Sequence, residues 1–294
     1  MSVIRYEGPV YRPPSEANSL LIQATVGCPH NKCTFCMVYK KGPPYKVRPV
    51  RDIIEDIDRA KEIYGPAIPT LFFPAGNTIA MPTDELAQIC AHARSVFSSL
   101  KRITVYGSSQ YIYRKGLSDL VKLKENGLSR IHVGLESGDD EILRKIKKGT
   151  NTAEQIQAGK WVKEAGIELS EYVMLGVGGK VRTREHAEAT AKALTAIDPD
   201  YIRLRTFIPK INTLLLHQIK KGRFQMLSAH EVLMETRSLI ENIDVTSRIS
   251  SDHYTNYIDV SGWIPKDRES MLKVIDEALK RDESTFRSVF VGTQ

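Results

Sequence analysis

The chain has 294 residues, of which 41% are hydrophobic and 26% are charged, values typical of a globular protein with a substantial buried core. Its 42 lysines and arginines exceed its 35 acidic residues, but the resulting charge of +7 is scattered in short clusters such as residues 145–148 that are typical of solvated surface. No apolar run approaches the roughly 20 residues of a membrane helix, and residues 1–16 lack an apolar signal core, which argues against membrane and secreted proteins. We therefore expect a cytoplasmic protein without a membrane partner.

The first two thirds of the chain alternate short apolar runs with helical patterns. A proline-rich arm leads to an apolar, partly β-branched run over residues 20–26, which predicts a buried strand. Residues 48–63 then place isoleucine and alanine at helical spacing and predict the first helix. Further strands are predicted over residues 70–73, 103–106, 131–135, 167–175 and 201–208, and further helices over residues 83–97, 116–125, 139–165 with a break near 149, and 183–197.

Six strand and helix repeats predict a parallel sheet, because parallel neighbours need a crossover connection. We expect an α/β fold in which this sheet curves into a partial (β/α)6 parallel barrel. Beyond it the sequence predicts a loop over residues 209–224, a helix over 229–243, a strand over 246–249 and a helix over 267–281. We therefore expect residues 1–210 to form the barrel core with its arm, and residues 211–294 to form a short α/β extension that caps the barrel.

Three of the four cysteines, Cys28, Cys33 and Cys36, lie in one short loop after the first predicted strand. Three thiolates delivered by one loop suit a soft metal or an iron–sulfur cluster, and in a [4Fe-4S] cluster they leave one iron open for another ligand. The alternative is a structural zinc site, in which His30 supplies the fourth ligand. The remaining Cys90 falls in the apolar stripe of a predicted helix and is expected in the core.

Small and polar residues follow the next four predicted strands. In parallel barrels the loops at these carboxyl ends form the active site, and five such loops in succession disfavour a remote zinc site. Small residues let the backbone approach a ligand, and an asparagine carbonyl can accept a hydrogen bond from an ammonium group, although a tight turn would need the same residues. The candidate ligand-binding residues are Ala75, Gly76, Asn77, Ser108, Gln110, Glu136, Ser137, Gly176 and Gly178.

The cysteine loop, with Phe35 just before Cys36, resembles the cluster loop of the radical S-adenosylmethionine (SAM) superfamily. Four residues separate Cys28 from Cys33, as in a minority of that superfamily, whereas most members have three. The resemblance covers about residues 12–208, and the rest of the chain looks most like a group of compact iron–sulfur oxidoreductases with the same wider spacing. It implies a barrel of radical SAM type, a [4Fe-4S] cluster on the three cysteines and SAM as the second cofactor.

The resemblance also implies an activity and site roles. The enzyme would reductively cleave SAM to methionine and a 5′-deoxyadenosyl radical that takes a hydrogen atom from a substrate, with an electron donor of the flavodoxin or ferredoxin type. Residues 75–77 would hold the SAM amino group, although many members carry two glycines and a carboxylate there. Glu136 would accept hydrogen bonds from the ribose, unless it pairs with Arg130 or Arg205. Ser108 and Gln110 would also meet the ribose, and residues 176–179 would lie under the adenine.

Five residues in the last third of the sequence are candidates for substrate binding. Arg203 and Arg205 share the parity of one predicted strand and would form a clamp for a carboxylate or phosphate, or a solvent-facing or salt-bridged pair. Asp252, His253 and Asn256 could bind substrate or move protons. We therefore expect a small anionic substrate. The alternatives are an RNA- or protein-modifying radical SAM enzyme that uses the basic surface, and a zinc-stabilised binding module.

Overall fold

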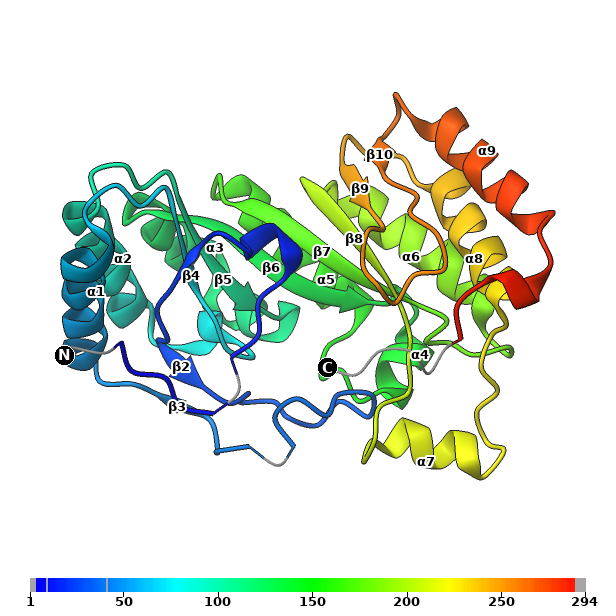
Figure 1. Cartoon of the computed structure of the whole chain (residues 1–294), viewed down its shortest axis with the longest axis horizontal. Helices are drawn as coiled ribbons and strands as arrows, with labels where there is room; N and C mark the ends of the chain where they lie inside the picture. The colour runs from blue at the N-terminus through cyan, green and yellow to red at the C-terminus, as the bar shows by residue number, and fades with distance from the viewer. Residues whose placement is uncertain (1–3, 9, 41, 289–294) are drawn as a thin grey trace. The chain divides into compact units, whose positions relative to one another are not determined.

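The computed structural model describes residues 4–8, 10–40 and 42–288 (Figure 1). The strands are β1 (Leu20–Leu21), β2 (Thr25–Val26), β3 (Lys46–Val47), β4 (Thr70–Phe73), β5 (Arg102–Gly107), β6 (Leu128–Glu136), β7 (Glu168–Leu175), β8 (Tyr201–Thr206), β9 (Arg248–Ser250) and β10 (Gly262–Trp263). The α-helices are α1 (Val50–Tyr64), α2 (Thr83–Val96), α3 (Ser109–Glu125), α4 (Asp140–Lys145), α5 (Thr152–Glu164), α6 (Thr183–Ile197), α7 (Leu214–Lys220), α8 (Ala229–Asn242) and α9 (Arg268–Leu279).

The main sheet has the strand order β1-β4-β5-β6-β7-β8-β9-β10. The pairs from β1 to β6 and from β7 to β9 are parallel, whereas β10 runs antiparallel to β9. Within the described ranges no pairing joins β1 to β10, so the sheet is not closed. This arrangement confirms the predicted α/β fold with a partial parallel barrel. None of the helices in the described part of the chain has the length and apolar character to cross a bilayer.

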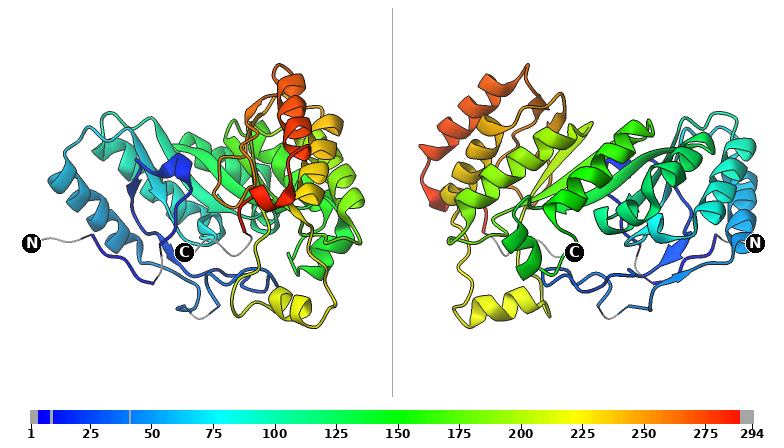
Figure 2. Two further views of the ribbon diagram at one scale, coloured as in Figure 1. Left: turned by 45° about the vertical axis from the view of Figure 1, so that its right-hand side comes forward. Right: turned by 180° about the vertical axis from the view of Figure 1, so that it is seen from behind.

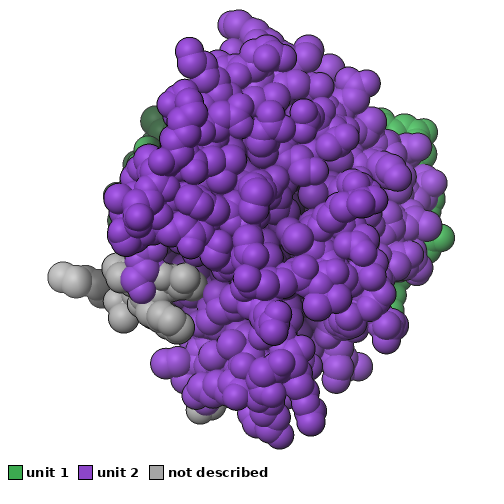
Figure 3. Space-filling model, turned by 90° about the vertical axis from the view of Figure 1, so that its right-hand side faces the viewer, with its two compact units in different colours: residues 1–31, 38–133, 161–169 green, residues 32–37, 134–160, 170–294 purple. Residues whose placement is uncertain are grey.

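The chain divides into two compact units, which Figure 3 colours separately. Unit 1 comprises residues 1–31, 38–133 and 161–169, and unit 2 comprises residues 32–37, 134–160 and 170–294. In unit 1, α1 packs on α2 and α2 on α3, and α1 and α2 are seen at the left edge of Figure 1. In unit 2, α6 packs on α8 and α8 on α9 (Figure 2). Cys90 is fully buried on α2, which confirms its predicted place in the core.

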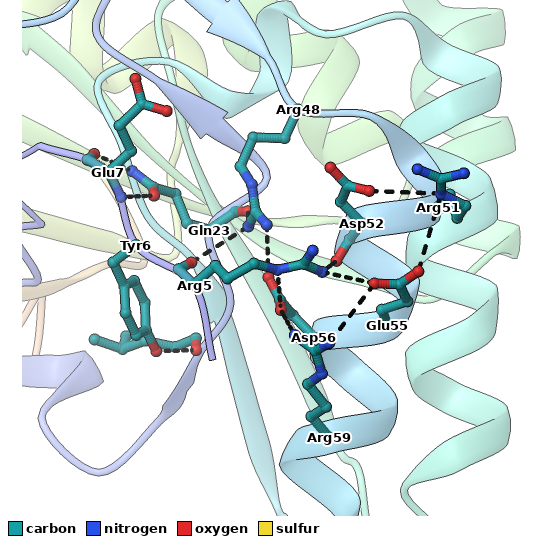
Figure 4. A network of polar contacts seen from close by, with 11 residues as sticks. Arg5, Tyr6, Glu7, Gln23, Arg48, Arg51, Asp52, Glu55, Asp56 and Arg59 are labelled. Carbon is teal, nitrogen blue, oxygen red and sulfur yellow. Dashed lines mark hydrogen bonds and ion pairs between the residues drawn. The ribbon is translucent and has the colours of Figure 1, made fainter. Parts of the chain in front are cut away.

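The N-terminal arm is fastened to α1 by a network of charged side chains (Figure 4). Asp56 is fully buried and accepts hydrogen bonds from Arg5 Nε at 2.9 Å and from Arg48 Nη2 at 2.6 Å. Arg48 also donates to the carbonyl of Gln23 at 2.5 Å, and the Gln23 side chain bonds the backbone of Glu7 in both directions. One buried carboxylate therefore joins the arm, the segment after β1 and the first helix.

The predicted strand over residues 20–26 is two strands in different sheets, which corrects the prediction. β1 pairs with β4, whereas β2 pairs antiparallel with β3 in a separate two-stranded sheet. Between them, the carbonyl of Gln23 is occupied by Arg48 and the carbonyl of Ala24 accepts from the Arg48 backbone amide. These contacts replace strand pairing in the middle of the run, and the apolar pattern alone could not indicate them.

Three further differences concern segments with weak sequence signals. The third helix begins at Ser109 rather than at 116, and Gly116, with φ of +72°, breaks it in the middle. The predicted loop over 209–224 contains α7, whose first turn is capped by Thr213 accepting from the amide of Leu216 at 3.2 Å. β3 and β10 are two residues long, too short for a period-2 pattern to be recognised. The other predicted strands and helices agree with the structure to within a few residues.

Candidate active site

The first part of the cysteine loop lies in unit 1, beside the loop that follows β4. The amide of Gly76 donates to the carbonyl of Gly27 at 3.2 Å, directly before Cys28. A Cβ atom at position 76 would lie 2.8 Å from Cys28 Cβ, so only glycine allows this approach. The structure thus brings together two of the segments that the sequence predicts to bind cofactor. Cys28 is half-buried and its thiol is free.

The second part of the cysteine loop, residues 32–37, belongs to unit 2. The amide of Thr34 donates to the carbonyl of Ile146 at 2.9 Å, and its carbonyl accepts from the amide of Leu215 at 3.1 Å. Phe35 packs against a buried cluster made by Ile142, Leu143, Ile146 and Val177. Cys33 and Cys36 are half-buried, and neither forms a disulfide bond. Backbone bonds and one aromatic side chain hold this segment in place.

The loops after β4 and β5 present buried acceptors without donors. Asn77 is 1% exposed, and its Nδ2 donates to Ser108 Oγ at 2.9 Å. Its Oδ1 is buried and accepts from none of the residues that the structure describes, and the same holds for Gln110 Oε1. A buried orphan acceptor is unfavourable unless a ligand supplies a donor. An ammonium group or ribose hydroxyls would supply such donors, so these two buried acceptors fit SAM as the ligand.

Ala75 adopts a backbone conformation that side chains disfavour. Its φ is +111°, in the region that glycine reaches without a steric penalty. Such strain is worth on the order of 1–3 kcal/mol and persists only where the surrounding structure enforces it. Alanine at a position where many members of the resembled superfamily carry glycine therefore strains the loop that approaches Cys28.

Glu136 forms a buried ion pair with Lys148 in unit 2. Lys148 Nζ lies 2.8 Å from Glu136 Oε1, and the two side chains are 9% and 12% exposed. Both groups lie over Gly134, where a Cβ atom would contact the Glu136 carboxylate and would be 2.8 Å from Lys148 Nζ. Glu136 therefore does pair with a base, but not with the predicted Arg130, which pairs with Glu168 at 2.8 Å.

A third ionisable residue, Glu171 on β7, interacts electrostatically with both Glu136 and Lys148. It is 1% exposed, and burial raises its pKa to about 8, an effect that Lys148 opposes and Glu136 reinforces. Burial alone would lower the pKa of Lys148, but the charges of Glu136 and Cys33 outweigh it and raise that pKa. The sequence reasoning missed both residues. It placed Lys148 in a solvated basic cluster, which is wrong, and a carboxylate inside the apolar run of β7 was the available signal for Glu171.

Three other residues that were predicted to bind a cofactor, Ser137, Gly176 and Gly178, contact other residues of the protein. Ser137 is fully buried, with its Oγ 2.9 Å from His186 Nδ1 and accepting from the amide of Asp139 at 3.0 Å. The amide of Gly176 donates to Glu235 Oε1 at 2.6 Å. Gly178 lies so close to Ile142 that a Cβ would be 2.8 Å from its Cδ1. Their SAM contacts remain predictions.

Arg203 and Arg205 lie on one face of β8, where half-buried and fully buried positions alternate. In the parallel register they stand opposite Tyr172 and Met174 of β7. Arg203 Nε donates to Ser170 Oγ at 3.1 Å. Arg205 is half-buried and forms no ion pair or side-chain hydrogen bond with any residue of the described ranges. Of the two arginines, Arg205 is the one available to a ligand.

His253 is surrounded by positive charge. Burial lowers its pKa to about 4, and Arg205, Arg287 and Lys210 add to this effect. Its Nδ1 lies 2.7 Å from Thr255 Oγ1 and accepts from the Thr255 amide at 3.2 Å, which assigns the proton of the neutral ring to Nε2. Asp252, by contrast, is exposed. The sequence reasoning found His253 and Arg205 but missed Lys210 and Arg287, which lie far apart in the chain.

The comparisons with known proteins agree with this geometry. The family model described as the Radical SAM superfamily matches residues 22–194. Among curated proteins, the chain is 24% identical over 189 residues to the threonylcarbamoyladenosine tRNA methylthiotransferase MtaB of Rickettsia prowazekii, covering 62% of this chain and 44% of the relative. It is 28% identical over 188 residues to the tRNA-2-methylthio-N(6)-dimethylallyladenosine synthase of Thermodesulfovibrio yellowstonii, covering 64% and 43%. The chain thus spans less than half the length of these two relatives.

Solved structures share the fold at low identity. The methyltransferase TsrM from Kitasatospora setae, solved with cobalamin and a [4Fe-4S] cluster, aligns with a TM-score of 0.58 at 18% identity over 69% of this chain and 39% of that chain. Methylornithine synthase (PylB) aligns with 0.53 at 16% identity over 90% and 83%. Coproporphyrinogen III oxidase (HemN) from Escherichia coli aligns with 0.55 at 17% identity over 76% and 52%.

The family match covers more than half of the chain and includes the cysteine loop and every strand from β2 to β7. It favours the iron–sulfur alternative over a structural zinc site, and it agrees with the predicted [4Fe-4S] and SAM cofactors of the family. The chain belongs to the radical SAM superfamily.

Proposed function

We propose that this radical SAM enzyme acts on a small anionic substrate, which Arg205, Lys210 and Arg287 recognise beside His253. The carrying observation is geometric: the Asn256 side chain accepts from the amide of Thr206 at 2.7 Å, which holds the loop of His253 against β8 next to Arg205, and Arg287 donates to the carbonyl of Asn256. None of Arg205, Lys210 and Arg287 forms an ion pair with a carboxylate in the described part of the chain, and all three lower the pKa of His253. Arginine and lysine side chains that lack a carboxylate partner favour a carboxylate or phosphate ligand.

The residues that we propose to bind the cofactors are chosen by the chemistry of their side chains. Cys28, Cys33 and Cys36 would hold the [4Fe-4S] cluster, because they are half-buried thiols in one loop and none of them forms a disulfide bond. Asn77 Oδ1, an orphan acceptor, would receive a hydrogen bond from the SAM ammonium. When bound, the cluster and SAM supply the electron and the hydrogen-abstracting radical, while the protein supplies binding and orientation.

Two of this chain's own groups would orient the ligands. Lys148 fixes the carboxylate of Glu136 through one of its oxygens and leaves the other to accept from a ribose hydroxyl. His253 stays neutral at pH 7 because its pKa lies near 4, so it can donate a hydrogen bond through Nε2 without adding a fourth positive charge. The enzyme also requires an external one-electron donor, for which a flavodoxin or ferredoxin remains our proposal.

RNA modification is the second candidate, and the names of the curated relatives favour it. The relatives from Rickettsia prowazekii and Thermodesulfovibrio yellowstonii are named as tRNA-modifying enzymes. The chain matches only 44% and 43% of their lengths, so their whole activity does not transfer. The two candidates differ in what accelerates SAM cleavage, a small anion or an RNA.

The test is a screen of substrates with the anaerobically reconstituted enzyme. Formation of 5′-deoxyadenosine is measured with dithionite and SAM in the presence of carboxylates, phosphate esters, their neutral esters or amides, and tRNA. We expect a small anion to raise the rate at least tenfold, and we expect Arg205→Met to abolish this stimulation. The matched control is Arg184→Met, because Arg184 is 82% exposed and pairs with Glu188 on the surface of α6. Stimulation by neutral compounds or tRNA alone, or an unchanged response of Arg205→Met, would overturn the proposal.

A further inference from the structure

A cavity of about 540 Å³ lies in unit 1, away from every residue considered so far for cofactor binding. Its lining includes Arg102, Leu128 and Glu168, the first residues of β5, β6 and β7. Arg94 and Lys124, near the ends of α2 and α3, and Lys101 complete much of its wall. The cavity therefore opens at the amino-terminal ends of the parallel strands.

The cavity is a separate site from the loops that follow β4 and β5. Asn77 and Ser108 lie beyond the carboxyl ends of these strands, whereas Arg102 begins β5 at the opposite end. Strands advance roughly 3.3 Å per residue, so the six residues of β5 place about 17–20 Å between its two ends. A ligand in the cavity would not touch the proposed SAM contacts of unit 1.

Positive charge dominates the wall of the cavity. Five cations, at positions 94, 101, 102, 124 and 130, face two carboxylates, Glu125 and Glu168, which leaves a net charge of +3. The inner cations are paired: Arg130 lies 2.8 Å from Glu168, and Arg102 lies 3.1 Å from the buried Glu16. The positive charge that no carboxylate balances therefore comes from the outer cations of the wall, Arg94, Lys101 and Lys124.

The outer cations have no acidic partner. Lys101 and Lys124 are exposed and form no ion pair with any residue that the structure describes. Arg94 donates through Nη1 to the carbonyl of Leu100 at 3.1 Å and likewise reaches no carboxylate. The buried Nε of Arg102 donates to none of the described residues. Arg94 and Lys124 lie in the last turns of helices, where cations also stabilise the helix ends, but Lys101 and Arg102 do not.

We propose that this cavity binds a compact anion that carries phosphate groups. Arginine and lysine donors spread over a concave wall match the several oxygens of a phosphate or pyrophosphate. The volume lies in the range of small-molecule sites, roughly 300–1,000 Å³, and a concave wall with its innermost arginine 7% exposed suits a small ligand better than an RNA helix.

Isothermal titration calorimetry of the reconstituted full-length enzyme with pyrophosphate tests the proposal. The test variant is Lys101→Ala/Lys124→Ala, which changes two exposed side chains without an ion-pair partner. The matched control is Lys160→Ala/Lys192→Ala, which removes the same charge from two exposed lysines outside the cavity. We expect the test variant to weaken pyrophosphate binding at least tenfold, and the control variant to change the Kd less than twofold. Absence of binding at millimolar pyrophosphate, or equal losses in both variants, would overturn the proposal.

Two further arms identify the ligand class. Inorganic phosphate should bind more weakly than pyrophosphate, because it offers fewer oxygens to the same cations. A single-stranded RNA 12-mer should compete poorly with pyrophosphate. RNA that binds tightly, is weakened by the lysine substitutions and is not displaced by pyrophosphate would instead assign the surface to nucleic acid and contradict the proposal. Thermal unfolding of both variants separates a loss of binding from a loss of structure, and none of these readouts depends on SAM cleavage.

Discussion

Lys148 Nζ lies 2.8 Å from Glu136 Oε1, and neither side chain is more than 12% exposed. A buried ion pair contributes little net stability, but removing one partner leaves an uncompensated charge in a site of low polarity. The fully buried Glu171 does not add to this demand at pH 7, because burial raises its pKa to about 8 and its carboxyl group is mostly protonated. Lys148 is therefore the counter-ion on which the Glu136 carboxylate depends.

Replacing Lys148 by methionine should destabilise the protein and weaken SAM binding. The uncompensated Glu136 would lower the free energy of unfolding by about 3 kcal/mol, the lower end of the range for broken buried pairs. Because Glu136 would also lose its fixed orientation, we expect SAM affinity to fall at least tenfold. Urea unfolding and equilibrium dialysis with SAM measure the two effects.

The control for this substitution is Lys145→Met. Lys145 pairs with Glu141 at 2.7 Å, but its side chain is 54% exposed, so the pair is screened by solvent. Such surface pairs contribute about 0–1 kcal/mol. Equal losses of stability in the two variants, or unchanged SAM affinity in Lys148→Met, would contradict the role assigned to Lys148.

Glu171 should make stability fall as the pH rises. Its pKa is raised from the ordinary value of 4.5 to about 8 in the folded protein, because burial disfavours the charged form. Below pH 4.5 both folded and unfolded chains hold the proton, so the favourable contribution is complete. Between pH 4.5 and 8 only the folded chain holds it, and stability declines by about 1.4 kcal/mol per pH unit from this group.

The variant Glu171→Gln keeps the shape of the neutral acid and removes the titration. We expect the difference in unfolding free energy, wild type minus variant, to decrease by about 4 kcal/mol between pH 5 and pH 8. Urea unfolding at four pH values measures it. Parallel stability curves for the two proteins would show that Glu171 does not hold its proton.

Ala75→Gly should stabilise the loop beside Cys28. Glycine relieves a strain of about 1–3 kcal/mol at a φ of +111°, against about 0.4–1 kcal/mol of added backbone entropy and about 0.8 kcal/mol for the lost buried methyl. The midpoints of these ranges leave a net gain of about 0.5 kcal/mol, and their most favourable values leave a gain of about 1.8 kcal/mol. The control is Ala91→Gly, at an exposed position within α2, which should lose about 1 kcal/mol. If both variants lose stability equally in urea, Ala75 is not strained.

Asp56→Asn should loosen the N-terminal arm. Arg48 is 9% exposed and would lose its carboxylate, so we expect a loss of about 3–5 kcal/mol of stability. Asp58→Asn is the control on the same helix, because Asp58 is 52% exposed and pairs with His92 at the surface. It should change stability by less than about 1 kcal/mol. Thermal unfolding compares the two, and equal melting temperatures would contradict the importance of the network in Figure 4.

The sequence predicted the elements that repeat, because apolar periodicity is a local property. β4 and α6 were predicted at their observed bounds, and the predicted break near 149 lies between α4 and α5. It failed where long-range contacts decide, as at Gln23 and Ala24, whose carbonyls are taken by Arg48. Strand pairing there depends on a residue more than 20 positions away, which no local pattern contains.

The candidate site likewise contains residues that a local pattern predicts and residues that only the fold reveals. Cys28, Asn77 and Glu136 were predicted as candidates because each lies at or just beyond the carboxyl end of a strand, and position in a parallel sheet predicts the functional edge. Lys148 was missed because a lysine in a basic run is usually solvated, and only the fold shows that it is buried against Glu136. Lys210 and Arg287 were missed because the chain brings them near His253 from separate segments.

Iron content and 5′-deoxyadenosine formation after anaerobic reconstitution test the central claim most directly. The wild type should bind about four irons per chain and release 5′-deoxyadenosine when dithionite and SAM are added. The triple variant with Cys28, Cys33 and Cys36 changed to alanine should lose both, whereas Cys90→Ala should keep both, because Cys90 lies in the core of α2. A colourless wild-type protein with one zinc, or 5′-deoxyadenosine formation that survives in the triple variant, would contradict the account.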